Sequence, residues 1–213
     1  MQRASRKSAH QTVDVAGSKP FIQRIVTAAR QHFLSNGFRS VTMDDLAHEL
    51  GMSKKTLYAS FPSKTALLDA VLADKFRAVE ADLEEITSTC ASDVLGALHR
   101  LLACMQRHTE ELRPPFVRDM RKEGPVRFKE IERRRRDLIE RHFGKLLGEG
   151  RKAGIIRKDL SVPLIMEILL GAVQAIMNPV KIEELGLTPK TGFSTIITVI
   201  LEGIVTEPVR AKL

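Results

Sequence analysis

The sequence predicts an all-α protein, and three observations support this prediction. Apolar residues recur every three or four positions in successive segments that are separated by Gly, Pro or capping residues. Runs of β-branched residues with strict apolar–polar alternation are absent. Aromatic residues make up only 5% of the chain, with no Trp and one Tyr. A chain of 213 residues with 43% hydrophobic residues can bury a substantial core in one or two domains.

The charge of the chain favours an anionic partner. The formal net charge is +8, and residues 1–75 carry 11 Lys and Arg residues against 6 Asp and Glu residues. A basic first third that precedes a nearly balanced body is typical of a nucleic-acid-binding part joined to a second domain. Residues 1–18 are polar, basic and without periodicity, so we expect a disordered basic arm. Such an arm can reach into a minor groove, and an unbound tail is the alternative.

Residues 42–64 predict two short helices joined by a tight turn. Thr42 and Ser53 are suited to cap the two helices, and Gly51 tolerates the left-handed dihedrals that the turn needs. A basic, hydroxyl-rich second helix held by a small apolar core is the pattern of a helix-turn-helix. In that second helix Lys54, Lys55, Thr56 and Tyr58 occupy polar positions, while Leu57 and Phe61 point inward.

Further helices are expected on both sides of this motif. A helix from Pro20 to Asn36 completes a three-helix domain, which we place at residues 19–66. A long helix at about 64–88 has no Gly or Pro and forms a rigid connection to the second half. Residues 67–213 are predicted to form a second helical domain, for ligand binding and dimerisation.

The last two predicted helices, at about 162–178 and 189–206, are apolar nearly all round. A helix without a polar face is buried on every side. We therefore expect one face of each to pack on the body and the other on a second copy of the chain, giving a homodimer. Two central helices in a monomeric core are the alternative.

Several classes of protein are disfavoured by the sequence. The longest apolar stretch has 16 residues and is interrupted by Glu167, whereas a spanning helix needs roughly 20, so no membrane segment is expected. Cys90 and Cys104 form no CxxC pair, and with no signal peptide this favours a reduced, cytoplasmic location. No nucleophile elbow, P-loop, GxGxxG or HExxH is present, so no catalytic residues and no cofactor are predicted, and an enzyme is a poor alternative.

Cys104 and His108 are four positions apart and share a helix face. They could form half of a metal site, but no second pair at ligand spacing is evident and a structural zinc site has four ligands. No metal site is therefore predicted, and these residues are interpreted as part of a core or pocket.

A set of N-terminal residues follows a known order and spacing: Ile25, Ala28, Ala29, Phe33, Gly37, Phe38, Thr42, Leu46, Ala47, Gly51, Ser53, Thr56, Leu57, Tyr58, Phe61, Lys64, Leu67 and Leu68. In this respect residues 20–72 resemble the TetR/AcrR family of transcriptional regulators. The resemblance implies a homodimer that binds a palindromic double-stranded DNA operator. It also implies that the regulator, usually a repressor, is released from the operator when a small molecule enters the C-terminal domain.

The resemblance assigns roles within the motif. Lys54, Lys55 and Thr56 would lie in the major groove. Thr42, Tyr58 and Lys64 would hold phosphates, and Ser53 completes the DNA-binding set. This agrees with the residues themselves, since a lysine can donate to guanine and phosphate contacts set the register. A regulator without an effector, or an activator, remains an alternative.

A small-molecule pocket is expected between the long helix and the last two helices. Methionines suit an adaptable apolar cavity, although residues of these types more often belong to a plain core. The expected lining residues are Met105, His108, Phe116, Met120, Phe128, Ile131 and Gln174.

Overall fold

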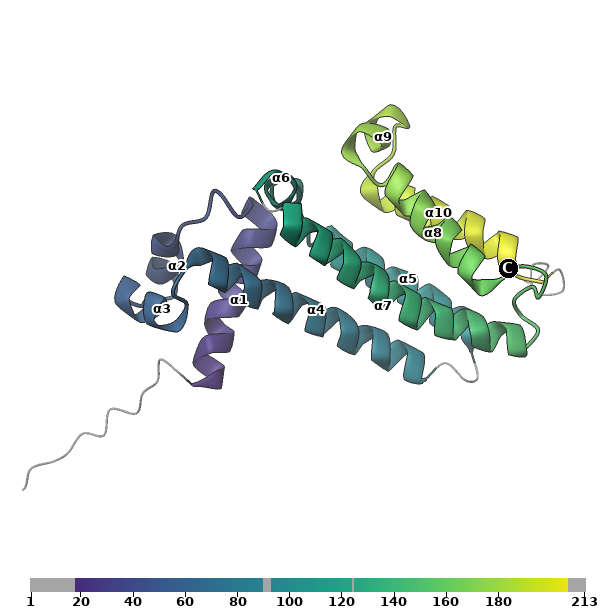
Figure 1. The fold of residues 1–213 in the computed structure, drawn as a ribbon, viewed down its shortest axis with the longest axis horizontal. Coiled ribbons are helices and arrows are strands. Elements are labelled where there is room, and N and C mark those ends of the chain that lie inside the picture. Colours follow the sequence, from purple (N-terminus) through teal and green to yellow (C-terminus); the bar gives the residue numbers. More distant parts are fainter. Residues whose placement is uncertain (1–17, 90–92, 124, 207–213) are drawn as a thin grey trace, which may run out of the picture.

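In a computed structural model of the protein, the chain is built almost entirely of helices, which confirms the all-α prediction (Figure 1). The structure describes residues 18–89, 93–123 and 125–206, so the predicted basic arm lies outside them apart from its last residue. The helices in this part of the chain are α1 (Lys19–Asn36), α2 (Met43–Glu49), α3 (Lys54–Ser60), α4 (Lys64–Ser88), α5 (Val94–Glu110), α6 (Pro114–Glu123), α7 (Pro125–Lys152), α8 (Val162–Ile176), α9 (Pro179–Glu184) and α10 (Pro189–Ile204).

The N-terminal helices α1, α2 and α3 share a small apolar core with the first turns of α4 and with α6. Ile25, Leu57 and Leu67 are completely buried in this core, and Phe116 of α6 is nearly so. A three-helix unit of this size is marginally stable alone. The contribution from α4 and α6 therefore supplies apolar burial that α1 to α3 lack, and it fixes the motif to the rest of the molecule.

Hydroxyl side chains begin the helices of the motif, as the sequence predicts. Thr42, Ser53 and Ser63 each accept a backbone N–H from the residue three positions further on. An N-cap of this kind stabilises a helix by about 1 kcal/mol. Between α2 and α3, Gly51 has a φ of 64°, in the left-handed region that favours glycine. The relative orientation of α2 and α3 is thus set locally.

Helix α4 connects the two halves of the molecule (Figure 1). It has 25 residues without interruption, as predicted, and so extends about 38 Å. One polar and one charged residue lie within its buried stripe, a feature that the sequence interpretation missed. The stripe recurs every fourth position and consists of Val71, Lys75, Val79, Leu83 and Thr87.

The second half of α4 packs with α5, α7, α8 and α10 around a larger apolar core. Figure 1 shows α8 and α10 side by side, far from α2 and α3. A β-bridge between Ile156 and Val205 connects the segment after α7 to the end of α10. Among the described residues, no helix combines the length and the apolar character needed to cross a bilayer.

The C-terminal helices differ from the sequence prediction in two respects. The helix expected at 162–178 ends at Ile176, and the short helix α9 follows, which was not predicted. The cause is local, because the side chain of Asn178 accepts the backbone N–H of Lys181 at 2.9 Å and starts a new helix. The last helix ends at Ile204, two residues earlier than expected.

Candidate nucleic-acid interface

Helices α2 and α3 lie at one end of the molecule, where α3 is held by its apolar side (Figure 1). Leu57 is completely buried and Phe61 nearly so, which fixes the rotation of α3 about its axis. The opposite side of the helix is exposed at Lys54, Lys55 and Tyr58. A short basic helix in a fixed orientation is what insertion into a DNA groove requires.

Thr42 and Asp45 form a reciprocal capping box at the start of α2. The Thr42 hydroxyl donates to Asp45 Oδ2 at 2.7 Å and accepts the Asp45 backbone N–H at 3.1 Å. The hydrogen bond from the Thr42 hydroxyl, and then the one from the Thr42 backbone N–H, hold the pKa of the Asp45 carboxyl below its usual value. Thr42 is exposed, so a phosphate can still approach its backbone and side chain.

Ser53 and Thr56 are linked in the same way at the start of α3. The Ser53 hydroxyl accepts the Thr56 backbone N–H at 3.1 Å, and the two hydroxyl oxygens are 2.8 Å apart. One hydroxyl of the pair must donate to the other, so Thr56 is already engaged within the protein. The Thr56 side chain therefore has less freedom to read a base than the exposed lysines have.

The two lysines of α3 differ in their surroundings. Lys54 forms an ion pair with Asp44 of α2, and both side chains are more than half exposed. Lys55 is also exposed and makes no ion pair with any residue that the structure describes. A lysine head group that is not engaged can donate to guanine O6 or N7. Of the predicted base readers, Lys55 is thus the one most available for DNA.

Tyr58 and Lys64 lie beside this surface. Tyr58 is 46% exposed although its ring is large and apolar, which leaves its hydroxyl accessible. The Lys64 ammonium lies 4.5 Å from the centroid of the Phe38 ring and donates to the backbone oxygen of Arg39 at 3.3 Å. Lys64 is therefore positioned by the turn after α1, as suits a phosphate contact that sets the register.

Polar side chains join the motif to the body of the protein, and sequence reasoning missed them. Arg30 of α1 forms ion pairs with Asp74 of α4 at 3.3 Å and with Glu111 at 2.8 Å, just beyond α5. Glu111 also accepts from Lys75 at 2.6 Å, and Lys75 lies 2.9 Å from His108 Nδ1. This cluster, Arg30–Asp74–Lys75–His108–Glu111, connects α1, α4 and α5.

Burial and charge both act on the pKa values in this cluster. Burial lowers the pKa of the Lys75 ammonium, although Glu111 opposes the effect. Burial would raise the pKa of Glu111, but hydrogen bonds from Arg30 and Lys75 outweigh it and the pKa is lowered. The pKa of His108 is lowered, first by burial and then by Lys75. The lowered pKa values favour the charged carboxylate of Glu111 and the neutral imidazole of His108, while burial acts against the charged ammonium of Lys75.

The seven residues expected to line a pocket lie in different parts of the structure. Met105 belongs to the larger core, whereas Phe116 and Met120 pack in the N-terminal core with Phe128 beside them. The remaining three are His108 in the polar cluster just described, half-buried Ile131 on α7 and exposed Gln174 on α8. They do not gather around one hollow, and their role in ligand binding stays a prediction.

The motif and the whole fold both have counterparts among known proteins. Residues 25–71 match the family described as "Bacterial regulatory proteins, tetR family". The HTH-type transcriptional regulator UidR of Escherichia coli strain K12 is 26% identical over 200 residues, which cover 89% of this chain and 95% of UidR.

Two solved structures share the fold. One is SmeT, described as the repressor of the Stenotrophomonas maltophilia multidrug efflux pump SmeDEF. It superposes with a TM-score of 0.64 and 20% identity, over 92% of this chain and 95% of SmeT. The other is a regulator from Saccharomonospora viridis, solved in complex with choline. Its TM-score is 0.68 with 21% identity, over 89% of this chain and all of that one.

Proposed function

The chain belongs to the TetR family of bacterial transcriptional regulators, and we propose its mode of action on this basis. Members of the family are DNA-binding proteins and not enzymes. We propose that it is a homodimeric repressor that binds a palindromic operator and is released by a small molecule. The observation that carries the proposal is the exposed, rigidly held α3, whose lysines point away from the protein core. A base-reading helix needs this combination of exposure and fixed orientation.

An exposed apolar surface on α8 and α10 supports the homodimer. Leu164 and Ile168 of α8 are 50% and 53% exposed, and Val199 of α10 is 65% exposed. Gly171 and Ala175 continue the exposed side of α8 at helical spacing, without a charge. Apolar surface of this kind on neighbouring helices marks a protein–protein contact, and self-association through two-fold symmetry is the commonest form.

A hollow between α5 and α10 supports a small-molecule effector. Its volume is about 350 Å³, within the range of ligand sites. Leu95, Leu102 and Phe193 provide apolar walls, and His99 and Gln106 provide polar groups. The fold accommodates small molecules in at least one instance, since the regulator from Saccharomonospora viridis was solved with choline.

Two of the physical connections between the motif and the body can couple effector binding to DNA binding. One is α4, which begins at the motif and packs against α5 and α7 further along. The other is the contact of α1 with the end of α5, through Arg30 and Glu111. An effector that favours one arrangement of these helices changes the spacing of the two α3 helices in the dimer. A coupling free energy of about 1–3 kcal/mol would weaken DNA binding roughly 5- to 150-fold.

The test combines a thermal-shift screen with DNA binding. We expect a compound from a library of metabolites and antimicrobials to raise the melting temperature, because a ligand that binds the folded state stabilises it. The same compound should weaken binding to a duplex that the protein has itself selected in vitro. Stabilising compounds that leave DNA binding unchanged would contradict release by an effector, whereas failure to bind any duplex would contradict the DNA-binding mode itself.

A further inference from the structure

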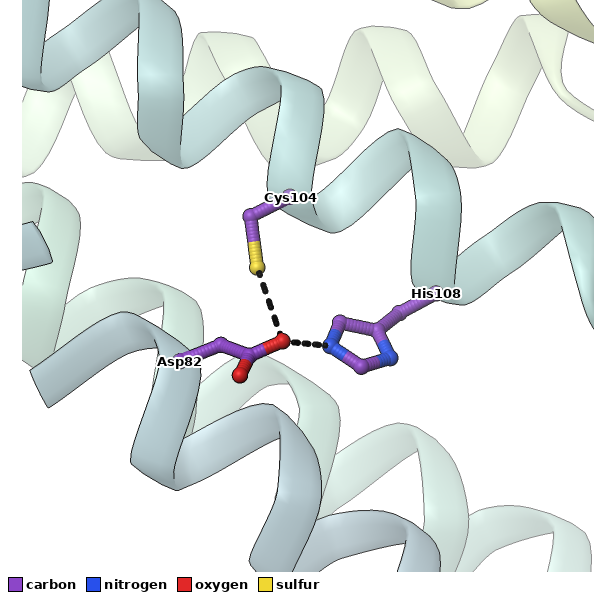
Figure 2. A group of neighbouring side chains, drawn as sticks. All are labelled: Asp82, Cys104 and His108. Atoms are coloured by element: carbon purple, nitrogen blue, oxygen red, sulfur yellow. Dashed lines mark hydrogen bonds and ion pairs between the residues drawn. The ribbon is translucent and has the colours of Figure 1, made fainter. Parts of the chain in front are cut away.

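Three side chains of different chemistry converge between α4 and α5 (Figure 2). Cys104 and His108 lie one helical turn apart on α5 and point toward Asp82 on α4. The Cys104 sulfur is 4.0 Å from Asp82 Oδ2, and His108 Nε2 is 2.8 Å from the same oxygen. The three potential ligand atoms all lie within 4.8 Å of one another.

These distances suit a common metal ion. Zinc binds sulfur at about 2.3 Å and nitrogen or oxygen at about 2.0–2.2 Å, so neighbouring ligands of a tetrahedral ion lie about 3–4 Å apart. Asp82 lies on α4 and the other two residues on α5, and these two helices pack directly against each other. Adjustment of the three side chains can therefore bring the ligand atoms to these separations.

We propose that Asp82, Cys104 and His108 form a binding site for Zn²⁺. One sulfur, one nitrogen and one oxygen ligand suit a metal of intermediate softness. A thiolate and a carboxylate also neutralise the two charges of the ion, so the occupied site is electrically balanced. Three protein ligands leave a fourth position for water, in contrast to the closed four-ligand sites that are structural.

Of the three side chains, that of Asp82 is the most exposed. The side chain of His108 is 8% exposed and Cys104 is buried, while the side chain of Asp82 is 37% exposed. Zn²⁺ and its remaining water molecule can therefore approach along the Asp82 carboxylate. The sequence interpretation missed this site because the third ligand is 22 residues before Cys104 and on another helix.

Without a metal ion, the Arg107 side chain forms an ion pair with the Asp82 carboxylate. Its guanidinium donates to Asp82 Oδ2 at 2.6 Å and lies 3.9 Å from the Cys104 sulfur. The Arg107 side chain is 65% exposed, so it can turn into solvent when Zn²⁺ binds. An exposed ion pair of this kind contributes at most about 1 kcal/mol, which a zinc ion bound by three protein ligands readily exceeds.

Occupation of the site has a direct connection to the DNA-binding motif, and this part of the inference rests on the proposed function. Lys75 Nζ lies 2.9 Å from His108 Nδ1, and Glu111 Oε1 lies 3.6 Å from the same nitrogen. When Nε2 binds the metal, a neutral imidazole carries its proton on Nδ1, which can then donate to Glu111. Glu111 also holds Arg30 of α1, so metal binding redistributes the contacts that fix α1.

The experiment is a titration of the full-length, tag-free, reduced protein with Co²⁺, followed by Zn²⁺. We expect one Co²⁺ per chain, a thiolate-to-cobalt charge-transfer absorption, and its loss when Zn²⁺ displaces Co²⁺. Cys104→Ser should abolish the absorption, and Asp82→Asn should weaken Co²⁺ binding more than about tenfold. Should Cys104→Ser fail to fold by circular dichroism, the exposed Asp82→Asn tests the same site.

Cys90→Ser is the matched control, since it removes a thiol that is not one of the three proposed ligands, and it should bind Co²⁺ as the wild type does. No thiolate absorption in the wild type, or one that Cys90→Ser abolishes, would overturn the site.

Binding of the selected duplex with and without Zn²⁺ is measured separately. If Zn²⁺ leaves the affinity for the duplex unchanged, the regulatory role of the site is rejected. If the protein binds no DNA, the proposed function is rejected, and the Co²⁺ titration still decides whether the metal site exists.

Discussion

The buried carboxylate of Asp119 accepts the backbone N–H of Arg39 across 2.9 Å, and this bond joins α6 to the turn that follows α1. The same carboxylate lies against Gly37, where a Cβ atom would come within 2.8 Å of Asp119 Oδ2. Gly37 also has a φ of 92°, which favours glycine. The body of the protein therefore holds the end of α1 directly, in addition to its connection through α4.

Asp119→Ala should destabilise the protein by about 1–3 kcal/mol, because it removes the part-buried hydrogen bond from the Arg39 backbone N–H to a charged carboxylate. Asp119→Asn retains an acceptor oxygen and should cost less. Asp137→Ala, which removes an exposed carboxylate from α7, is the control and should stay within about 0.5 kcal/mol of the wild type. The measurement is urea unfolding followed by circular dichroism. Equal stability of Asp119→Ala and wild type would contradict the role given to this bond.

Asp44→Asn should strengthen DNA binding. Asp44 holds Lys54 in an ion pair and also places a negative charge beside the expected phosphates. An exposed ion pair is worth about 0.2–1 kcal/mol, so its removal should lower Kd roughly 1.4- to fivefold. Fluorescence anisotropy with the selected duplex measures this, and Asp137→Asn on α7 serves as the charge-matched control. Weaker binding by Asp44→Asn would mean that the carboxylate orients Lys54 for DNA.

Ile168→Arg should convert the dimer into a monomer. Ile168 lies on the exposed apolar side of α8, where an arginine would carry an unpaired charge into the subunit contact. Val126→Arg is the control, because Val126 of α7 is 81% exposed and lies outside the α8–α10 surface. Size-exclusion chromatography with light scattering should give about twice 23.8 kDa for wild type and control. A monomeric wild type, or a dimeric Ile168→Arg variant, would contradict the assignment of this surface.

Stability should fall as the pH drops below about 6.5, with a contribution from His142. His142 is 4% exposed, its Nδ1 lies 3.2 Å from the Thr87 hydroxyl, and its Nε2 has no partner among the described residues. Burial, and then Arg141, lower the pKa of His142 in the folded state. The unfolded chain therefore binds the proton first, so the stabilising effect is complete above the unfolded pKa and declines below it.

His142→Gln should flatten this pH dependence, because glutamine does not titrate. Urea unfolding at intervals between pH 8 and pH 5.5 measures the free energy of unfolding of both proteins. The two curves should differ in slope below about pH 6.5 and run parallel above it. Equal slopes over the whole range would show that His142 is protonated with the same pKa in the folded and unfolded states.

The helix-turn-helix was predictable from the sequence because its determinants are local. Thr42, Ser53 and Gly51 act on residues within three positions, and the apolar residues of α3 repeat at helical spacing. Contacts between helices were harder to predict from the sequence, because the tertiary fold determines which helix faces meet. Lys75 gave a usable signal, because it occupies the i+4 position between Val71 and Val79 in a buried stripe.

Asp119 could likewise have been identified from the sequence, because it lies between Phe116 and Met120 on the apolar side of α6. An acidic residue at such a position indicates a buried polar contact. The expected pocket residues gave no usable signal of this kind, because methionines and phenylalanines at helical spacing line cores and cavities alike. Two of the three proposed Zn²⁺ ligands could be grouped from the sequence, because Cys104 and His108 share a helix face. Asp82 could not, because the contact of α4 with α5 brings it to them.

We propose that α3 reads DNA as one of two symmetric copies, with Lys55 as a base reader. In vitro selection of bound DNA with the wild type and with Lys55→Ala tests it most directly, with Tyr58→Phe as the control for a phosphate contact. We expect the wild type to enrich an inverted repeat, Lys55→Ala to change the preferred bases within each half-site at unchanged spacing, and Tyr58→Phe to bind the wild-type sequence more weakly. No inverted repeat from the wild type, or an identical base preference for Lys55→Ala, would contradict the account.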